Sequence, residues 1–213
     1  GSATAPVPDG ACGGATGGIQ EFSVGGGGVL VPQQCFTSQG TSPVWAVRDS
    51  TGSYLYVLDQ QAPLVWDPTT QTYVVPPYGD ITVFSIAPDT GRLTLVLNQQ
   101  IKDHTGAQLT YFPVGNFQQG RSPSMLLLAG GGCMMTLDKG DQTVYPYSIG
   151  GNGQLTNTAN SLVSINSTNA TSISANGSSV YITDAGATPA SPGGYILPFT
   201  VGNNGALQAQ TGG

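Results

Sequence analysis

A hairpin pattern that recurs along this chain constrains its fold more than any other feature. Each copy is an alternating strand with an aromatic residue, then a turn containing glycine, then a leucine; clear copies occupy residues 81–93, 143–155 and 194–207, and a degenerate one residues 18–30. The aromatic positions follow at steps of 62, 63 and 52 residues: Phe22, Phe84, Tyr147 and Phe199. Alternation with a period of two indicates strands with one buried face. Glycine in the turns supplies the positive φ that short hairpin loops require.

A second hairpin falls between these copies, at residues 43–59, 122–138 and 171–184. Each one ends on an aspartate, and these are Asp59, Asp138 and Asp184. An aspartate at a strand end can accept backbone N–H groups of the following loop. Two hairpins per period make a four-stranded sheet, and sheets repeated at about 40–50 residues are typical of β-propellers.

We therefore predict an all-β chain with β-propeller repeat architecture and about three to four four-stranded blades. A Gly/Pro-rich N-terminal segment occupies residues 1–17. We expect blade-like units at residues 18–80, 81–142 and 143–193, and an incomplete one at residues 194–213.

The composition favours strands and excludes several classes of partner. Charged residues make up 8% of the chain, against about 25% in an average globular protein. Glu21 is the only glutamate, and Lys102 and Lys139 are the only lysines, so the usual surfaces of amphipathic helices cannot be built. The net charge of −6, with scattered cations, argues against binding to nucleic acid or to an anionic membrane. We also expect no membrane span, because no apolar run approaches about 20 residues.

The three cysteines leave the redox state open. Cys12 and Cys35 lie in loop-like sequence and can form a disulfide if the protein is exported, whereas Cys133 lies in a predicted buried strand. The lysine-poor, Thr/Asn/Gly-rich composition favours an extracellular or cell-envelope location, either periplasmic or secreted. Glycosylation motifs begin at Asn166, Asn169 and Asn176 and permit glycans in a eukaryotic secretory setting.

The segment Gly-Ser-Tyr-Leu-Tyr-Val-x-Asp at residues 52–59, followed by Ile-Thr-Val-Phe-Ser-Ile-x-x-x-Thr-Gly-x-Leu at residues 81–93, resembles the lactonase-type seven-bladed β-propellers. This family includes the bacterial 6-phosphogluconolactonases. The resemblance covers most of residues 18–210 as a repeat pattern, and it implies catalytic His, Arg and Glu residues around a central channel. A seven-bladed member needs well over 300 residues at about 45 per blade, so we expect either part of a longer protein or copies that complete one another.

No residue of this chain matches the catalytic set of that family, and we carry none over. His104, the only histidine, lies in a polar loop and is predicted to be a solvated turn residue. Residues 13–18 are predicted to form a flexible glycine loop and residues 138–141 an ordinary turn, so we expect neither a cofactor nor a metal ion. Residues 101–121 and 156–172 are predicted rim loops.

Trp66 and Tyr73 lie in a Pro-rich insert at residues 63–77 and are the aromatic residues that we expect to contact a partner.

Two hypotheses for the function follow. The first is a non-catalytic binding or structural module that forms a homo-oligomer or filament through exposed strand edges. The alternative is a lactonase-like hydrolase of sugar lactones, with catalytic residues outside this stretch. The identity of a small-molecule ligand is not predicted.

Overall fold

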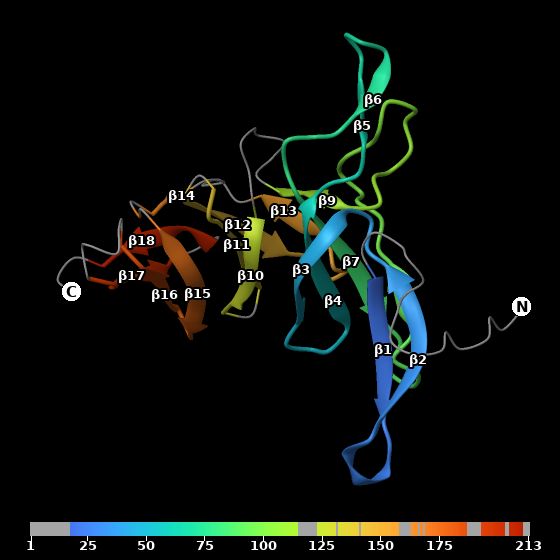
Figure 1. The fold of residues 1–213 in the computed structure, drawn as a ribbon, viewed down its shortest axis with the longest axis horizontal. Coiled ribbons are helices and arrows are strands. Elements are labelled where there is room, and N and C mark those ends of the chain that lie inside the picture. Colours follow the sequence, from blue (N-terminus) through green and yellow to red (C-terminus); the bar gives the residue numbers. More distant parts are fainter. Residues whose placement is uncertain are drawn as a thin grey trace, which may run out of the picture.

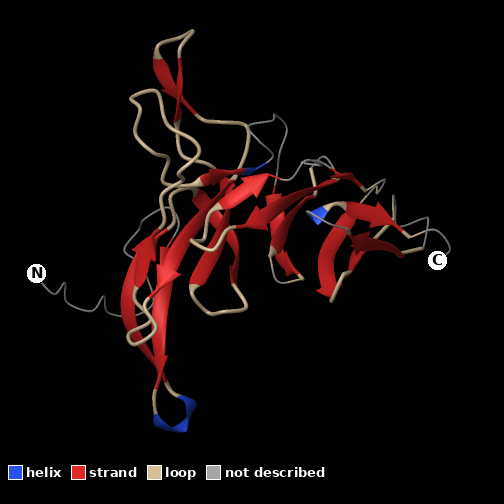
Figure 2. Cartoon of the chain, turned by 180° about the vertical axis from the view of Figure 1, so that it is seen from behind, coloured by secondary structure: helices blue, strands red, loops and turns tan. Residues whose placement is uncertain are grey.

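The computed structural model describes residues 18–114, 123–130, 132–140, 142–157, 163–165, 167, 169–186, 193–202 and 205–210. This part of the chain consists of strands, loops and a short 3-10 turn, and it contains no α-helix. Figure 2 shows that strands predominate. The predicted all-β class is confirmed.

Three four-stranded antiparallel sheets follow one another along the chain (Figure 1). The first sheet contains β3 (Thr41–Arg48), β4 (Tyr54–Gln61), β7 (Asp80–Ile86) and β8 (Leu93–Leu95), with β9 (Phe112–Pro113) added to β7. The second contains β10 (Pro123–Ala129), β11 (Cys133–Asp138), β12 (Thr143–Ile149) and β13 (Leu155–Asn157), with β14 (Val163–Ser164) added to β12. The third contains β15 (Ala170–Asn176), β16 (Ser179–Asp184), β17 (Tyr195–Val201) and β18 (Leu207–Ala209). We call these sheets blades 1, 2 and 3.

The three blades share one register, which supports the reading of the sequence as a repeat. The first and second strands of each blade pair with a register shift at the same place, after Pro43, Pro123 and Ala170. The aromatic residue of each third strand is buried, at 4% exposure for Phe84 and 2% for Tyr147. The turn glycines before the fourth strands all have positive φ, between 72° and 77°: Gly91, Gly153 and Gly205. Equivalent residues thus occupy equivalent places.

The blades pack face to face, and blade 2 supplies side chains to both packing interfaces. Met134 belongs to a core with Tyr56 and Leu58 of blade 1, whereas the next residue, Met135, belongs to a core with Ile182 of blade 3. Both methionines are 0% exposed, as alternation along a strand that is covered on both faces requires. The first strands β3, β10 and β15 lie next to one another. This arrangement is that of consecutive propeller blades.

The three hydrogen-bonded sheets begin at β3, β10 and β15. The expected boundaries at 142/143 and 193/194 fall between the second and third strands of blades 2 and 3, and the one at 80/81 falls after the first residue of β7. The reason is that the recurrent aromatic hairpin is the second half of a blade, so a count that starts from it is displaced by one hairpin.

The degenerate copy at residues 18–30 forms part of a separate two-stranded sheet, made of β1 (Gly18–Val24) and β2 (Leu30–Thr37). A short 3-10 turn, η1 (Gly26–Gly28), joins the two strands. Phe22 takes the place of the buried aromatics but is 44% exposed. The predicted segment 1–17 lies outside the described residues.

Candidate functional site

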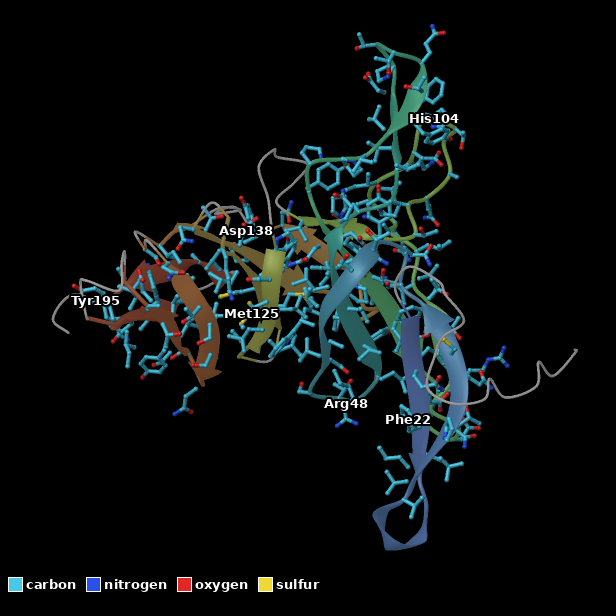
Figure 3. The ribbon with its side chains drawn as sticks, viewed as in Figure 1. Phe22, Arg48, His104, Met125, Asp138 and Tyr195 are labelled. Atoms are coloured by element: carbon cyan, nitrogen blue, oxygen red, sulfur yellow. The ribbon has the colours of Figure 1, made fainter. Side chains whose placement is uncertain are left out.

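Two inserts of blade 1 meet beyond the end of the sheet and bring three aromatic rings together. The first insert connects β4 to β7 and carries the hairpin of β5 (Val65–Asp67) and β6 (Thr72–Val74); the second connects β8 to β9. The imidazole of His104 stacks on the indole of Trp66, with ring centroids 4.9 Å apart and an interplanar angle of 14°. Tyr73 stands edge-on to both rings, at 5.4 Å from Trp66 and 5.6 Å from His104. Figure 3 shows His104 beside this projecting hairpin.

A pocket of about 460 Å³ opens beside these rings, within the range of about 300–1,000 Å³ that small-molecule sites occupy. We call it the aromatic pocket. Its walls come from both inserts, with Pro63, Leu64, Val65, Trp66 and Tyr73 on one side and Ile101, Lys102, Asp103, His104, Gln108, Leu109 and Thr110 on the other. The buried rings of Tyr78 and Tyr111 complete the lining. Burial raises the pKa of Tyr78 to about 12 and raises that of Tyr111 further, so both hydroxyls stay protonated at neutral pH.

Short-range hydrogen bonds shape the turns that present the aromatic pocket. Asp67 accepts the backbone N–H of Thr69 at 2.8 Å and the hydroxyl of Thr70 at 3.0 Å. Asp103 accepts the backbone N–H groups of Thr105 at 2.8 Å and of Ala107 at 3.0 Å. The hydrogen bond from the Thr105 side chain, together with these N–H groups, lowers the pKa of Asp103. Asp-Pro-Thr-Thr and Asp-His-Thr-Gly thus form locally determined turns.

Buried amide contacts anchor the second insert to the sheet. Asn98 is 1% exposed; its side-chain N–H donates to the carbonyl oxygen of Tyr111 at 3.2 Å. Its side-chain oxygen accepts the backbone N–H of Gln100 at 2.9 Å. On the first insert, the N–H of Ala62 donates to the carbonyl oxygen of Tyr78 at 3.0 Å. Ala62, Tyr78 and Tyr111 form a small apolar core of their own, so the aromatic pocket has a fixed floor.

The pocket combines ring faces with hydroxyl, amine and imidazole groups, which suits a small ligand with an apolar face and polar edges. In the described part of the chain, no group of three or more His, Cys, Asp or Glu side chains is placed to hold a metal ion. The same residues offer one imidazole, that of His104.

Trp66 and Tyr73, the two aromatic residues expected to contact a partner, both line the pocket. Tyr73 is 56% exposed. His104 is exposed in a turn, as predicted, but the sequence did not indicate that its ring stacks on Trp66. His104 and Trp66 meet because the inserts that carry them leave blade 1 from neighbouring strand ends, after β8 and after β4. Trp45, on β3 and outside the pocket, is 45% exposed.

A second pocket, of about 680 Å³, lies at the opposite end of blades 1 and 2. Arg48, Tyr54, Leu127 and Ile149 are among its lining residues. Figure 3 shows Arg48 at this end, away from His104. The hydroxyl of Tyr54 donates to the carbonyl oxygen of Gly151 at 3.3 Å across this boundary between the blades.

The cysteines and glycosylation motifs can be placed in part. Cys35 is disulfide-bonded and Cys133, on β11, carries a free thiol; burial raises the pKa of that thiol. Cys12, the other half of the predicted bridge, lies outside the described residues, as does Asn166. Asn169 and Asn176 are both exposed.

In the described ranges, no helix is long and apolar enough to cross a membrane.

No protein-family model matches the chain, and no curated protein matches it. It is similar to several solved structures. A protein from Lactobacillus plantarum has 12% identity and a TM-score of 0.47, with 92% of this chain and 64% of that chain covered. A putative 6-phosphogluconolactonase from Bacteroides uniformis has 13% identity and a TM-score of 0.39, with 93% and 78% covered. The periplasmic gluconolactonase of Pseudomonas aeruginosa has 12% identity and a TM-score of 0.43, with 92% and 64% covered.

The chain therefore spans 64% of the length of the first of these structures. Two of the three carry lactonase names.

Proposed function

We propose that this protein is a lactonase-like hydrolase whose aromatic pocket receives a sugar lactone or a cyclic ligand of similar size. The observation that supports this most is the meeting of Trp66, Tyr73 and His104 beside a pocket of about 460 Å³. The C–H face of a sugar ring is apolar and its edge carries hydroxyl groups. Ring faces on the two inserts suit that apolar face, and the hydroxyls of Tyr78 and Tyr111 and the amine of Lys102 suit the polar edge.

Sugar lactones are also the compounds that the names of the putative 6-phosphogluconolactonase and the gluconolactonase indicate for those proteins. We therefore take gluconolactone as the first compound to test.

Hydrolysis of a lactone needs a group that takes a proton from the attacking water and a donor that stabilises the oxyanion. Within the described residues, His104 is the candidate for the first role, because its imidazole lines the pocket. Lys102 lines the pocket too and is a candidate donor for the oxyanion. Catalytic groups that lie outside this stretch are the alternative that we expect from the sequence.

The test measures binding and turnover separately, on the wild type and on three variants. We expect gluconolactone to bind and to be hydrolysed by the wild type. Trp66→Ala should weaken binding at least about fivefold, because a ring face is lost. His104→Gln should retain binding and lose most turnover. Trp45→Ala, which removes an exposed indole outside the pocket, should change neither.

Two results would decide against this proposal. If Trp66→Ala and Trp45→Ala bind gluconolactone equally well, the aromatic pocket is not the binding site. If the wild type binds without any hydrolysis, the protein is a non-catalytic binding module, which is the other function that we expect from the sequence.

Self-association is a second candidate property, and the hairpin of β1 and β2 favours it. Each blade has four or five strands, whereas this sheet has two. Exposed apolar side chains gather on it, and these are Phe22, Val24, Val29, Leu30 and Val31. A second copy can add strands along the edge of β1 that no strand of the described ranges occupies. Analytical ultracentrifugation tests this: association should weaken in Phe22→Ser, and a monomeric wild type at high concentration would contradict it.

An extracellular or envelope location belongs to the same proposal. The disulfide bond at Cys35 supports it, because disulfides persist mainly in oxidising compartments. Fractionation of the producing cells checks the location directly.

A further inference from the structure

Two buried carboxyl groups lie opposite each other at the end of blade 1 from which the inserts leave. Asp59 on β4 and Asp80 on β7 are partners in the strand register, and both are 0% exposed. β4 ends at Gln61 and β7 begins at Asp80. The pair therefore lies at the base of the insert 62–79, which carries β5, β6 and one wall of the aromatic pocket.

Each carboxyl group has one oxygen with a partner and one without. Asp59 Oδ1 accepts the hydroxyl of Ser38 at 2.8 Å, and Asp80 Oδ2 accepts the hydroxyl of Thr82 at 3.3 Å. Asp59 Oδ2 and Asp80 Oδ1 are buried without a hydrogen-bond partner. A buried acceptor without a donor is costly, and two buried carboxylates side by side are more so.

Within the ranges that the structure describes, the groups packed around the pair offer no positive charge. Ser38 and Gly40 approach Asp59 from the segment before β3, and Thr82 approaches both carboxyls from β7. The titratable groups beyond Asp80 are the hydroxyls of Tyr78 and Tyr111. Both tyrosines are neutral at ordinary pH, so they cannot compensate two negative charges.

The space around the pair is also closely filled. A Cβ atom at Gly40 would overlap Asp80 Oδ1 and the carbonyl oxygen of Gln61, and it would lie 2.8 Å from Asp59 Cβ. A proton is the smallest partner that can satisfy both free oxygens. When one carboxyl is protonated, its O–H can donate to the free oxygen of the other.

We propose that Asp59 and Asp80 share one proton in the folded protein, and that this proton stabilises the base of the insert 62–79. Loss of the proton leaves two like charges in a buried site and loosens the insert. Burial, and then the neighbouring charge of Asp59, raises the pKa of Asp80 well above its ordinary value. Burial also raises the pKa of Asp59, to about 6.

The direction of the pH dependence follows from these shifts. The folded-state pKa of each carboxyl lies above the ordinary value of 3.8. The folded protein therefore binds more protons than the unfolded chain above about pH 4, and it loses stability as pH rises. The insert should be held most firmly in mildly acidic solution. This inference does not depend on what the aromatic pocket binds.

Thermal unfolding at pH 5 and pH 8 tests the proposal in the wild type, in Asp80→Asn and in Asp67→Asn. We expect the wild-type Tm to fall by about 4 °C or more between the two pH values. Asp80→Asn should lose less than half of that, because the new amide can donate to Asp59 Oδ2. Asp67→Asn, at a half-buried position on the same insert and away from the pair, should follow the wild type. An equal loss of Tm in wild type and Asp80→Asn would overturn the proposal.

Amide hydrogen exchange, compared between wild type and Asp80→Asn at the same pH, locates the effect. At pH 8 the insert 62–79 should exchange faster in the wild type, and at pH 5 the two proteins should agree. If Asp80→Asn does not fold, infrared spectroscopy of the wild type decides instead. A protonated-carboxyl band should be present at pH 6 and disappear at alkaline pH before unfolding, and its absence at pH 6 would overturn the proposal.

Discussion

The side-chain amide of Gln154 in blade 2 donates to the carbonyl oxygen of Leu97 in blade 1, at 2.7 Å. Its oxygen accepts the backbone N–H of Gln99 at 2.8 Å, so one buried side chain satisfies two backbone groups of the neighbouring blade. Gln142 acts similarly at the next boundary, where its side-chain oxygen accepts the N–H of Ala170 in blade 3 at 2.9 Å. Neutral amide side chains thus form hydrogen bonds between neighbouring blades. Only 8% of the residues of this chain are charged.

Replacing Gln154 by leucine should destabilise the protein markedly. The substitution keeps the approximate volume and leaves two backbone groups without partners, each costing about 1–3 kcal/mol. Chemical denaturation should show a loss of about 2–5 kcal/mol. Gln208→Leu, at an exposed position of β18, should change the free energy of unfolding by no more than about 0.5 kcal/mol. Equal stability of the two variants would contradict a role for Gln154 between the blades.

Gly40→Ala should be strongly destabilising. The new Cβ would overlap backbone and a buried carboxyl oxygen, and relief would need movement of β3 against β4. We expect a cost above about 2 kcal/mol. Gly132→Ala is the matched control, because a Cβ there meets no atom within 4 Å. Thermal unfolding of the two variants gives the comparison, and a wild-type Tm for Gly40→Ala would show that the base of the insert is less crowded than described.

Two isoleucines on neighbouring strands of blade 3 should differ sharply in their contribution. Ile182 is 0% exposed and packs in the core shared with blade 2, whereas Ile196 is 66% exposed. Ile182→Ala should cost about 2–5 kcal/mol. Ile196→Ala should cost no more than about 0.5 kcal/mol. Similar costs in denaturant unfolding would mean that blade 3 does not pack on blade 2 through this face.

The stacking of His104 on Trp66 should protect the indole from solvent. In a Trp45→Phe background, Trp66 is the only tryptophan, and acrylamide quenching reports its accessibility. His104→Ala should raise the quenching constant by about half or more, because one face of the indole lies under the imidazole ring. Lys102→Ala, on the same loop but outside the ring stack, should leave it unchanged. An unchanged constant in His104→Ala would rule out the stack in solution.

The protein should also lose stability in strong acid, through groups of the opposite kind to Asp59 and Asp80. Burial raises the pKa of Asp49, but hydrogen bonds from Thr51 and from backbone N–H groups outweigh it, so the net shift is downward. A lowered pKa contributes stability that is present above the unfolded value of 3.8 and is lost as pH falls through the folded value. Asp49→Asn should therefore lower the Tm at pH 6 and have less effect at pH 2.5.

Asp89→Asn, in an exposed turn, serves as the control for that measurement. Together with the raised pKa values of the buried pair, the shift at Asp49 predicts a maximum of Tm between about pH 4 and pH 6. A Tm that rises steadily from pH 4 to pH 8 would contradict the assignment of both kinds of group.

Local signals predicted the hairpins well, because turn chemistry depends on few residues. Glycine at positions 91, 153 and 205 adopts the positive φ that the pattern requires. The strand-end aspartates Asp138 and Asp184 accept the N–H groups of Gly140 at 2.8 Å and Gly186 at 2.7 Å, as expected for such turns. Asp59 differs, since its strand leads into the long insert, and its carboxyl binds Ser38 instead.

The aromatic pocket could not be predicted in the same way. Trp66 and His104 are 38 residues apart, and each belongs to an insert with no counterpart in the other blades. A repeat pattern has no information about inserts that interrupt it. The extent of each sheet also needs more than the repeat: a repeat fixes the period, but only hydrogen-bond pairing, such as that of β4 with β7, shows which strands share a sheet.

Amide hydrogen exchange of the whole chain tests most directly the claim that consecutive four-stranded blades carry the aromatic pocket. The account predicts the slowest exchange in the middle strands of the three blades, β4, β7, β11, β12, β16 and β17, and faster exchange in β5 and β6. Added gluconolactone should slow exchange only in residues 63–78 and 101–111. Slow exchange that does not group into three pairs of middle strands, or protection by the lactone elsewhere in the chain, would contradict it.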